Sequence, residues 1–305
     1  MINSSDISVI IQGPIDKTMI KFSVETIRKF LPKATIILST WEGSVCDGLD
    51  LDVLILNKDP GSFYCDSDNT IMTNINRQLV STKNGLNQVK TKYSMKLRSD
   101  LYLTSDKFLK YFDKFEKFDN KYKCFNHRLM VSSLTSKLYS DVGNNLPTPF
   151  HISDWFYFGY TQDLKKFYDA IPLIEDEAAF SKYVLKYPEK LPCPHLAFRY
   201  APEQYFAFNF FKSIYKDLRF DDWSDFDEKN IELSNILLAN NFIVLDTVQH
   251  GIYTDKHMGL IKKNNGRKFS FKGYITHYKF LKFYKKYCDN FYIIPLKYWF
   301  NKRCR

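Results

Sequence analysis

The first 104 residues alternate between two hydrophobic periods, and this alternation limits the folds open to the chain. Short apolar runs predict buried strands, whereas apolar residues recurring every three to four positions predict helices. Strands are predicted over 7–13, 34–40, 52–57 and 92–104, and helices over 18–31 and 74–90. Strands that alternate with helices form a largely parallel sheet through right-handed crossovers, with helices on both faces. We therefore expect an α/β, Rossmann-like fold that binds its ligand at the carboxyl ends of the strands.

The rest of the chain has weaker periodicity. A strand interrupted by charge is predicted over 150–160, helices over 163–171 and 201–215, and a late strand followed by a polar loop over 242–257. Pro202 and Glu203 open the second of these helices, since proline fits the first turn of a helix. No internal repeat or low-complexity linker divides the sequence. We expect one continuous unit over 1–260, with a basic aromatic helical appendage over 261–305.

The composition is that of an ordinary globular protein with room for a large core. Of the 305 residues, 45% are hydrophobic and 26% are charged, which makes disorder improbable. The sequence contains no run of 18 apolar residues and no signal-peptide pattern, which argues against a membrane span or secretion. Its six cysteines include no CxxC pair and are expected to be reduced thiols. These features predict a cytoplasmic protein.

The positive charge is concentrated at the C-terminus. Of the formal net charge of +10, residues 261–305 supply 13 basic side chains against Asp289 alone, so the first 260 residues sum to about −2. No helix-turn-helix, zinc-finger or RNA-recognition signature is present, and we expect no nucleic-acid partner. Basic residues interleaved with aromatic rings suit an anionic membrane surface. The alternative is a solvated charged face over a small aromatic core.

The end of the strand 92–104 carries a polar interruption, Arg98-Ser99-Asp100, within an otherwise apolar run. A polar turn where the chain reaches solvent is the simple explanation. The first strand, however, ends in QGPIDKT and lacks the GxGxxG and P-loop glycines that cradle phosphates. A divalent cation held by a carboxylate at a strand end is another way to bind a pyrophosphate. Asp100 is placed to hold such an ion, Mg²⁺ or Mn²⁺.

Seven short motifs in the first 205 residues together resemble the WavE-type lipopolysaccharide-synthesis family of bacteria. They are IIQGPI (10–15), IILSTWEG (36–43), DPG (59–61), NINRQ (74–78), KLRSD (96–100), HISDWFYFG (151–159) and PEQY (202–205). The resemblance implies a GT-A glycosyltransferase fold, with a nucleotide-sugar donor part over about 1–105 and an acceptor part over about 106–260. Such enzymes usually carry Asp-x-Asp where this chain has Arg98-Ser99-Asp100. Arg98 is therefore a further candidate for contacting a phosphate.

The chemistry of sugar transfer assigns roles to the polar residues. Asp100 is the expected metal ligand, with His250 or His257 as a possible additional one; a surface position is the alternative for either histidine. Two residues compete for the base that deprotonates the acceptor, Glu203 at the start of a helix and Asp154 inside an apolar stretch. We place Glu203 ahead, although its charge also suits a helix N-terminus, and keep Asp154 as a ligand for sugar or acceptor hydroxyls.

Weaker assignments complete the expected donor site. Asn76 and Arg77 lie at the beginning of the helix 74–90, where they are able to meet the donor, although helix capping explains asparagine there equally well. Gln12 and Gly13 end the first strand and would approach the nucleotide base or ribose. Trp41 follows the second strand and is a candidate nucleoside contact.

Two classes of function remain at this point. The first is a glycosyltransferase that moves a hexosyl or pentosyl group from a nucleotide sugar to a growing lipopolysaccharide, capsule or other surface glycan. It would act on a glycolipid acceptor at the inner face of the cytoplasmic membrane. The second is a non-catalytic or nucleic-acid-binding protein that keeps the same sheet. The sequence does not identify the donor, the acceptor or the stereochemistry of transfer.

Overall fold

The computed structural model describes residues 2–65, 68, 71–140, 146–182, 194–223, 225, 227–255 and 273–296. The strands are β1 (Ile7–Gln12), β2 (Thr35–Trp41), β3 (Val53–Asn57), β4 (Phe63–Tyr64), β5 (Met72–Thr73), β6 (Tyr93–Arg98), β7 (Tyr102–Leu103), β8 (Leu129–Ser132), β9 (Phe156–Tyr160), β10 (Phe242–Leu245) and β11 (Ile252–Tyr253). The helices are α1 (Lys17–Phe30), α2 (Ile75–Asn87), α3 (Thr161–Asp169), α4 (Asp176–Ala179), α6 (Pro202–Ile214), α7 (Glu228–Asn241), α8 (Thr247–His250) and α10 (His277–Tyr287). Short 3₁₀ helices are η1 (Ser4–Asp6), η2 (Lys107–Tyr111) and η4 (Pro194–Ala197).

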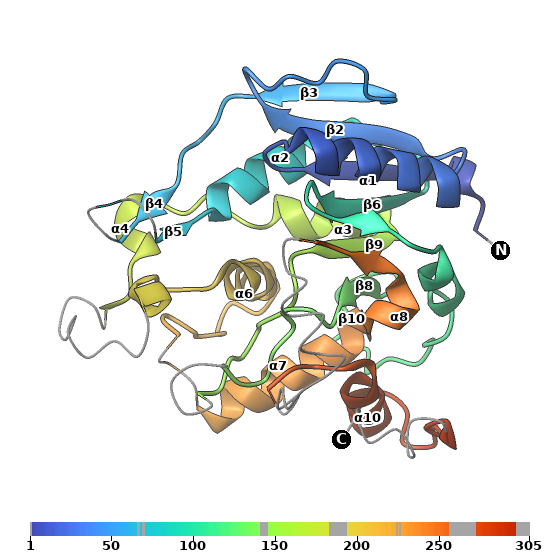
Figure 1. The fold of residues 1–305 in the computed structure, drawn as a ribbon. Coiled ribbons are helices and arrows are strands. Elements are labelled where there is room, and N and C mark those ends of the chain that lie inside the picture. Colours follow the sequence, from blue (N-terminus) through green and yellow to red (C-terminus); the bar gives the residue numbers. More distant parts are fainter. Residues whose placement is uncertain are drawn as a thin grey trace.

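A seven-stranded sheet forms the centre of the fold, in the order β10-β8-β9-β6-β1-β2-β3. Strands β1, β2, β3 and β6 are parallel to one another, and β8 is parallel to β10. Helix α1 lies in front of the sheet in Figure 1 and α2 lies behind it. The mixed α/β class and the mostly parallel sheet predicted from the sequence are confirmed. Helices cover both sides of the sheet because its parallel strands are buried on both faces.

The first half of the sheet has the strand order β3-β2-β1-β6. The chain moves outward from β1 to β3, returns through α2 and enters β6 on the other side of β1. Helix α2 packs tightly on this part: a Cβ added at Gly85 would collide with the Ile10 side chain of β1. The order reverses between β1 and β6, and in open α/β sheets ligands bind at that reversal.

Strand β9 runs antiparallel to both β6 and β8. Its register pairs Leu97 with Phe156, so the residues just before β9 lie beside the carboxyl end of β6. The strand predicted over 150–160 begins only at Phe156, because Ser153 N instead donates to the Ser136 hydroxyl at 3.0 Å. The four buried residues of β8 and the whole of α7 were not predicted, since short apolar pieces in this part of the sequence lack a clear period.

Residues 273–296 pack into the same unit as the sheet. Helix α10 contacts α7 and β10, and its Phe280 and Tyr284 rings each lie 5.0 Å from the Phe115 ring, centroid to centroid. These aromatic residues share one helix face and bury it. In its described part, the expected appendage is thus a helix at the edge of the core. Residues 261–272 and 297–305 lie outside the described residues.

Arg128, just before β8, is a fully buried cation that joins three segments. Its guanidinium donates to the backbone oxygens of Ala239 at 2.8 Å, Lys117 at 2.6 Å and Phe115. Arg128→Met would remove the guanidinium donor from these carbonyls, and we expect it to lower the free energy of unfolding by about 3–5 kcal/mol. Urea denaturation measures this change.

Arg219→Met is the matched control, because Arg219 also donates to backbone oxygens but does so at the surface. We expect its effect to stay within about 0.5 kcal/mol. Equal effects of the two substitutions would show that the buried bonds of Arg128 are not what stabilises this edge of the sheet.

Candidate active site

The carboxyl ends of β1 and β6 meet at the reversal of strand order, with Gln12 paired to Arg98. Gly13 follows with a φ of 119°, a conformation that favours glycine, and a Cβ there would lie 3.0 Å from Ser99 Oγ. Ser99 N donates to Gln12 O at 2.9 Å, and the Ser99 hydroxyl donates to Pro14 O. Ser99 thus fixes the two turns against each other at the carboxyl ends of β1 and β6.

The interruption of β6 is a turn that holds an ion pair, with Leu101 N donating to Arg98 O at 3.1 Å. Arg98 Nε and Nη2 donate to Asp100 Oδ1 and Oδ2 at 3.0 and 2.6 Å. The Arg98 guanidinium also lies 4.8 Å from the centre of the Trp155 ring. Its side chain is 24% exposed and that of Asp100 is 20% exposed. A bidentate pair stacked on an aromatic ring gives the cation a fixed direction.

Lys96 lies fully buried in β6, two residues before Arg98 and on the same face of the strand. Its ammonium donates to the backbone oxygen of Asp154. Burial lowers the pKa of Lys96 to about 8, while the Asp154 carboxylate acts in the opposite direction. Asp154 is 2% exposed, and neither its Oδ1 nor the hydroxyl of Tyr157 has a hydrogen-bond partner within the described chain. Buried polar atoms without partners mark a place for water or a ligand.

Glu203 is the second residue of α6 and keeps part of its surface exposed. Burial, followed by the nearby Asp154 carboxylate, raises the pKa of Glu203 to about 7. A hydrogen bond from the Thr135 hydroxyl and the charge of Lys137 act in the opposite direction. A carboxyl group whose pKa lies near neutral pH is suited to accept a proton from an alcohol.

The structure brings Arg98, Asp100, Asp154 and Glu203 into one electrostatic cluster. Burial disfavours the charge of Arg98, but the carboxylates of Asp100, Asp154 and Glu203 outweigh it and raise the pKa of the guanidinium. A permanently charged cation therefore lies near three carboxyl groups at the carboxyl ends of the strands. This arrangement is able to bind an anionic leaving group and to take up a proton. The individual roles expected from the sequence stay predictions.

Other expected donor contacts are engaged in the fold. Gln12 is 3% exposed, and its Oε1 accepts from the Ser81 hydroxyl of α2 at 2.8 Å. The Asn76 amide exchanges two hydrogen bonds of 2.9 Å with the backbone of Ile174. Arg77 forms a bidentate pair with Asp59, at 2.8 and 2.6 Å. Trp41 ends β2 and is partly exposed. Of these residues, only Gln12 lies beside the ion pair of β6.

The residues expected to hold Mg²⁺ or Mn²⁺ do not form a ligand set. Both oxygens of Asp100 accept from Arg98, and the described residues contain no group of three or more His, Cys, Asp or Glu side chains placed to hold a metal. His250 is fully buried: Ser132 Oγ lies 3.0 Å from its Nε2, Ile252 N donates to its Nδ1, and burial lowers its pKa to about 3. His257 lies outside the described residues. The donor atoms of the described residues therefore do not form a set that fits a divalent ion, and His250 is a core residue rather than a ligand.

Three residues of this cluster were missed in the sequence: Lys96, Trp155 and Thr135. A signal existed for Lys96, because period-two alternation places it on the same side as Arg98 within an otherwise apolar strand. Trp155 directly follows Asp154, which the sequence already assigns to the site, but no local pattern indicates that its ring lies against Arg98 or that Thr135 meets Glu203.

A pocket of about 390 Å³ lies beside the first turn of α6. Its walls come from β5, from the segment between β8 and β9, from η4 and the residues after it, and from Trp223. Pro202 and Gln204, the two neighbours of Glu203, both line it. The pocket therefore borders the first turn of α6, which carries Glu203.

None of the helices in the described ranges has both the length and the apolar character needed to cross a bilayer.

A search of the curated proteins finds no match. Among solved structures, one that matches is a mutant of the Drosophila beta-1,4-galactosyltransferase 7 in complex with manganese, UDP-Gal and xylobiose. It shares 10% identity with a TM-score of 0.28, and the alignment covers 53% of this chain and 51% of that one. The family model described as WavE lipopolysaccharide synthesis matches residues 7–304, so the chain belongs to the WavE family.

Proposed function

We propose that this protein is a glycosyltransferase that moves a sugar from a nucleotide-sugar donor to a growing lipopolysaccharide or another surface glycan. Membership of the WavE family supports the pathway. The single observation that carries the chemistry is the cluster of Arg98, Asp154 and Glu203 where the strand order reverses. The Rossmann-like half of the sheet supports the GT-A fold expected from the sequence.

In the proposed reaction, Glu203 takes the proton of the acceptor hydroxyl. The acceptor oxygen forms a bond to the anomeric carbon of the donor sugar as the bond from that carbon to the phosphate oxygen breaks. The electron pair of the broken bond leaves with the nucleotide, and Arg98 neutralises the added charge on its phosphate. The backbone of Gln12 and Gly13 approaches the nucleoside, and Asp154 accepts a hydrogen bond from a sugar hydroxyl.

A donor panel tests this proposal. The purified protein is incubated with UDP-, GDP- and CMP-sugars, and nucleotide release is followed with and without added glycan acceptors. We expect one donor to be consumed, slowly with water and faster with an acceptor. If the folded protein consumes no donor and binds no nucleotide, the proposal fails and the non-catalytic alternative takes its place.

We also propose that the protein works at the inner face of the cytoplasmic membrane, where a glycolipid acceptor would be presented. Three large apolar side chains follow α10 and are strongly exposed: Phe291 (87%), Ile293 (84%) and Leu296 (72%). Lys282 and Lys285 lie exposed on the helix just before them. Exposed apolar side chains beside basic ones suit an interface with anionic lipid. The rings of Tyr278, Phe280 and Tyr284 are buried and take no part.

Replacing Phe291, Ile293 and Leu296 together by serine is expected to weaken binding to anionic vesicles by roughly tenfold or more, because the inserted apolar surface is lost. Co-sedimentation with phosphatidylglycerol-containing vesicles measures this, and binding by the unchanged protein should fall as salt rises.

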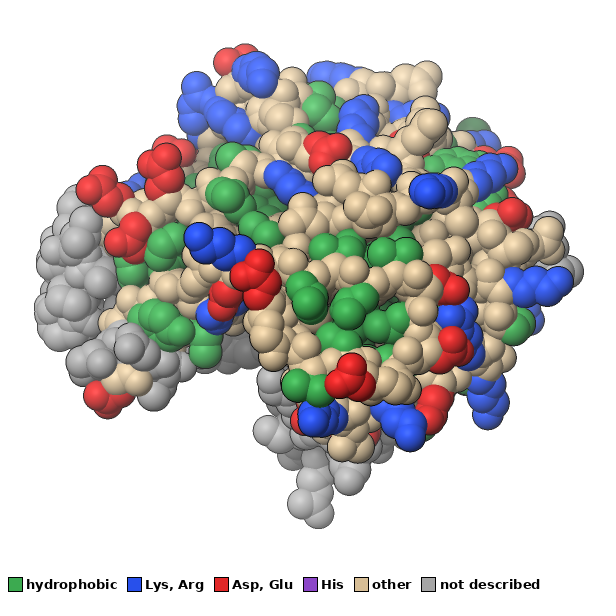
Figure 2. Space-filling view, turned by 90° about the horizontal axis from the view of Figure 1, so that it is seen from above, with side chains coloured by type: hydrophobic (Ala, Val, Ile, Leu, Met, Phe, Trp, Pro, Cys, Tyr) green, Lys and Arg blue, Asp and Glu red, His purple; other side chains and the backbone are tan. Residues whose placement is uncertain are grey.

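The control variant carries serine at Val45, Leu54 and Leu56, which are 53%, 45% and 46% exposed. Leu54 and Leu56 belong to β3, far from α10 (Figure 1). Figure 2 shows the molecule from above, and hydrophobic side chains gather on this face too. Equal loss of binding in both variants would contradict a specific membrane surface after α10.

A further inference from the structure

We infer that the pocket beside α6 binds a sugar ring of the acceptor glycan; this inference rests on the proposed function and gives the acceptor its place. Pro202 and Gln204, which precede and follow Glu203 in the sequence, both line the pocket. Lys137, whose charge acts on Glu203, lines it too. A molecule in the pocket therefore lies beside the first turn of α6, which carries Glu203, although the Glu203 side chain is not part of the lining.

The walls of the pocket have the chemistry that sugar rings require. Phe198, Tyr200 and Trp223 contribute aromatic surface, and Leu196 and Pro147 add apolar surface. The C–H faces of a pyranose pack on such surfaces, while its hydroxyls need a few polar partners around the edge. The volume of about 390 Å³ is near the lower end of the roughly 300–1,000 Å³ typical of ligand pockets. It fits one or two rings rather than a long chain.

Two hydroxyls in the wall still lack partners. Thr73 Oγ1 and Thr148 Oγ1 are buried and make no hydrogen bond within the described chain. The pocket lining includes the cation Lys137 and contains no carboxylate among the described residues. Native proteins rarely leave buried hydroxyls unsatisfied, and rotation of either side chain about χ1 would present its hydroxyl to a ligand in the pocket.

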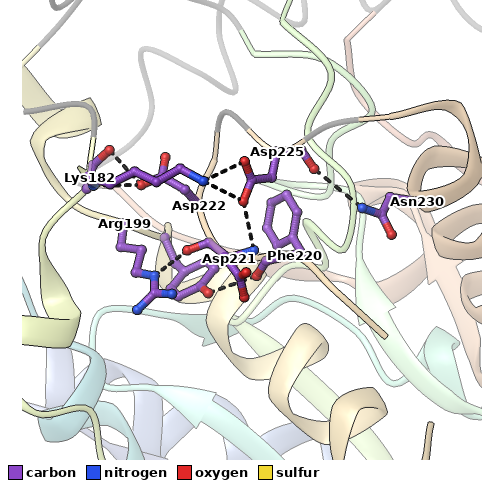
Figure 3. A network of polar contacts seen from close by, with 9 residues as sticks. Lys182, Arg199, Phe220, Asp221, Asp222, Asp225 and Asn230 are labelled. Carbon is purple, nitrogen blue, oxygen red and sulfur yellow. Dashed lines mark hydrogen bonds and ion pairs between the residues drawn. The ribbon is translucent and has the colours of Figure 1, made fainter. Parts of the chain in front are cut away.

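A polar network adjoins the aromatic residues of the pocket wall, and Figure 3 shows it from close by. The fully buried Asp222 carboxylate accepts from Lys182 N at 3.0 Å and from the Ser181 hydroxyl at 2.7 Å. Lys182 Nζ donates to both carboxylate oxygens of Asp225, at 2.8 and 3.0 Å, and Arg199 Nε donates to Asp221 O.

The same network fixes the rings themselves. Tyr200 donates its hydroxyl to Phe220 O at 2.8 Å, and Trp223 donates its indole N–H to Leu196 O at 2.8 Å. Both rings are thus oriented by hydrogen bonds to the backbone. A wall that is already in position loses little entropy when a ligand binds, as expected for a recognition surface.

Saturation-transfer NMR with a panel of methyl glycosides tests the inference without any donor. We expect the wild-type protein to transfer saturation to the ring protons of at least one glycoside, and Leu196→Trp, which fills the pocket, to abolish the signal. Leu173→Trp is the matched control, because Leu173 is 52% exposed and does not line the pocket. Equal signals from wild type and Leu196→Trp, or none from wild type, would overturn the inference.

A second measurement ties the pocket to transfer. With a donor that the protein consumes, Trp223→Ala should lower the ratio of transfer to hydrolysis by roughly tenfold, because the acceptor loses a stacking surface. An unchanged ratio would overturn the acceptor role. If no donor is consumed, the proposed function fails, and the NMR comparison still decides whether the pocket binds sugars.

Discussion

Glu203→Gln is expected to reduce the rate of sugar transfer by about 10²-fold or more, because glutamine cannot accept the proton of the acceptor hydroxyl. Donor affinity should change little, since Arg98 and the turn after β1 are intact. Single-turnover rates and nucleotide binding, measured on the same protein, separate the two effects.

The pH dependence provides an independent test of the same residue. The pKa of Glu203 is raised to about 7 by burial and by Asp154, and only the ionised form is a base. We therefore expect the transfer rate to rise with pH with a midpoint near 7. The stability of the fold depends on pH in the opposite direction, because the folded state holds the proton of Glu203 more tightly than the unfolded state does. This contribution to stability is full below about pH 4.5 and is lost as pH rises to about 7. Glu203→Gln should remove both dependences.

Glu177→Gln is the control, because Glu177 lies exposed in the short helix α4. It should leave the rate and its pH profile unchanged. Full activity of Glu203→Gln would move the role of base to Asp154, or would indicate a retaining reaction that needs no such base.

Arg98→Ala should raise the KM for the donor by roughly 10²-fold, since a charge-assisted bond to phosphate is worth about 1.5–3 kcal/mol. The effect should be on donor and nucleotide binding, which calorimetry with the nucleoside diphosphate measures directly. Arg28→Ala is a close control: Arg28 also pairs with a carboxylate, Asp50, and its side chain is also 24% exposed. It lies near the end of α1, away from the carboxyl ends of the strands.

Asp100→Asn distinguishes the two roles that the carboxylate is able to play. If Asp100 orients Arg98, the variant should fold, retain part of its donor affinity and be as indifferent to EDTA as the wild type. If the wild-type protein lost transfer activity in EDTA, this would contradict the proposal that Arg98 alone neutralises the charge of the phosphate. It would return Asp100 to the role of a metal ligand. If Asp100→Asn instead fails to fold, the ion pair serves the turn after β6 and not the donor.

The sequence by itself determined the α/β class, most strands and helices of the first half, and the position of Asp100 at a strand end. These features depend on local periodicity, which a chain expresses within a few residues. The pairing of Arg98 with Asp100 is also local, because the tight turn after β6 brings these two side chains together.

Only the tertiary structure decided which polar residues share a site. His250 looked available in a polar loop, but the fold buries it against Ser132. Asn76 is likewise engaged by Ile174, 98 residues away. Lys96 and Glu203 come from distant segments. Packing removes water from both, which lowers the pKa of Lys96 against the effect of Asp154 and, together with Asp154, raises the pKa of Glu203. Burial and long-range charge depend on how the segments pack together, and no local pattern in the sequence encodes them.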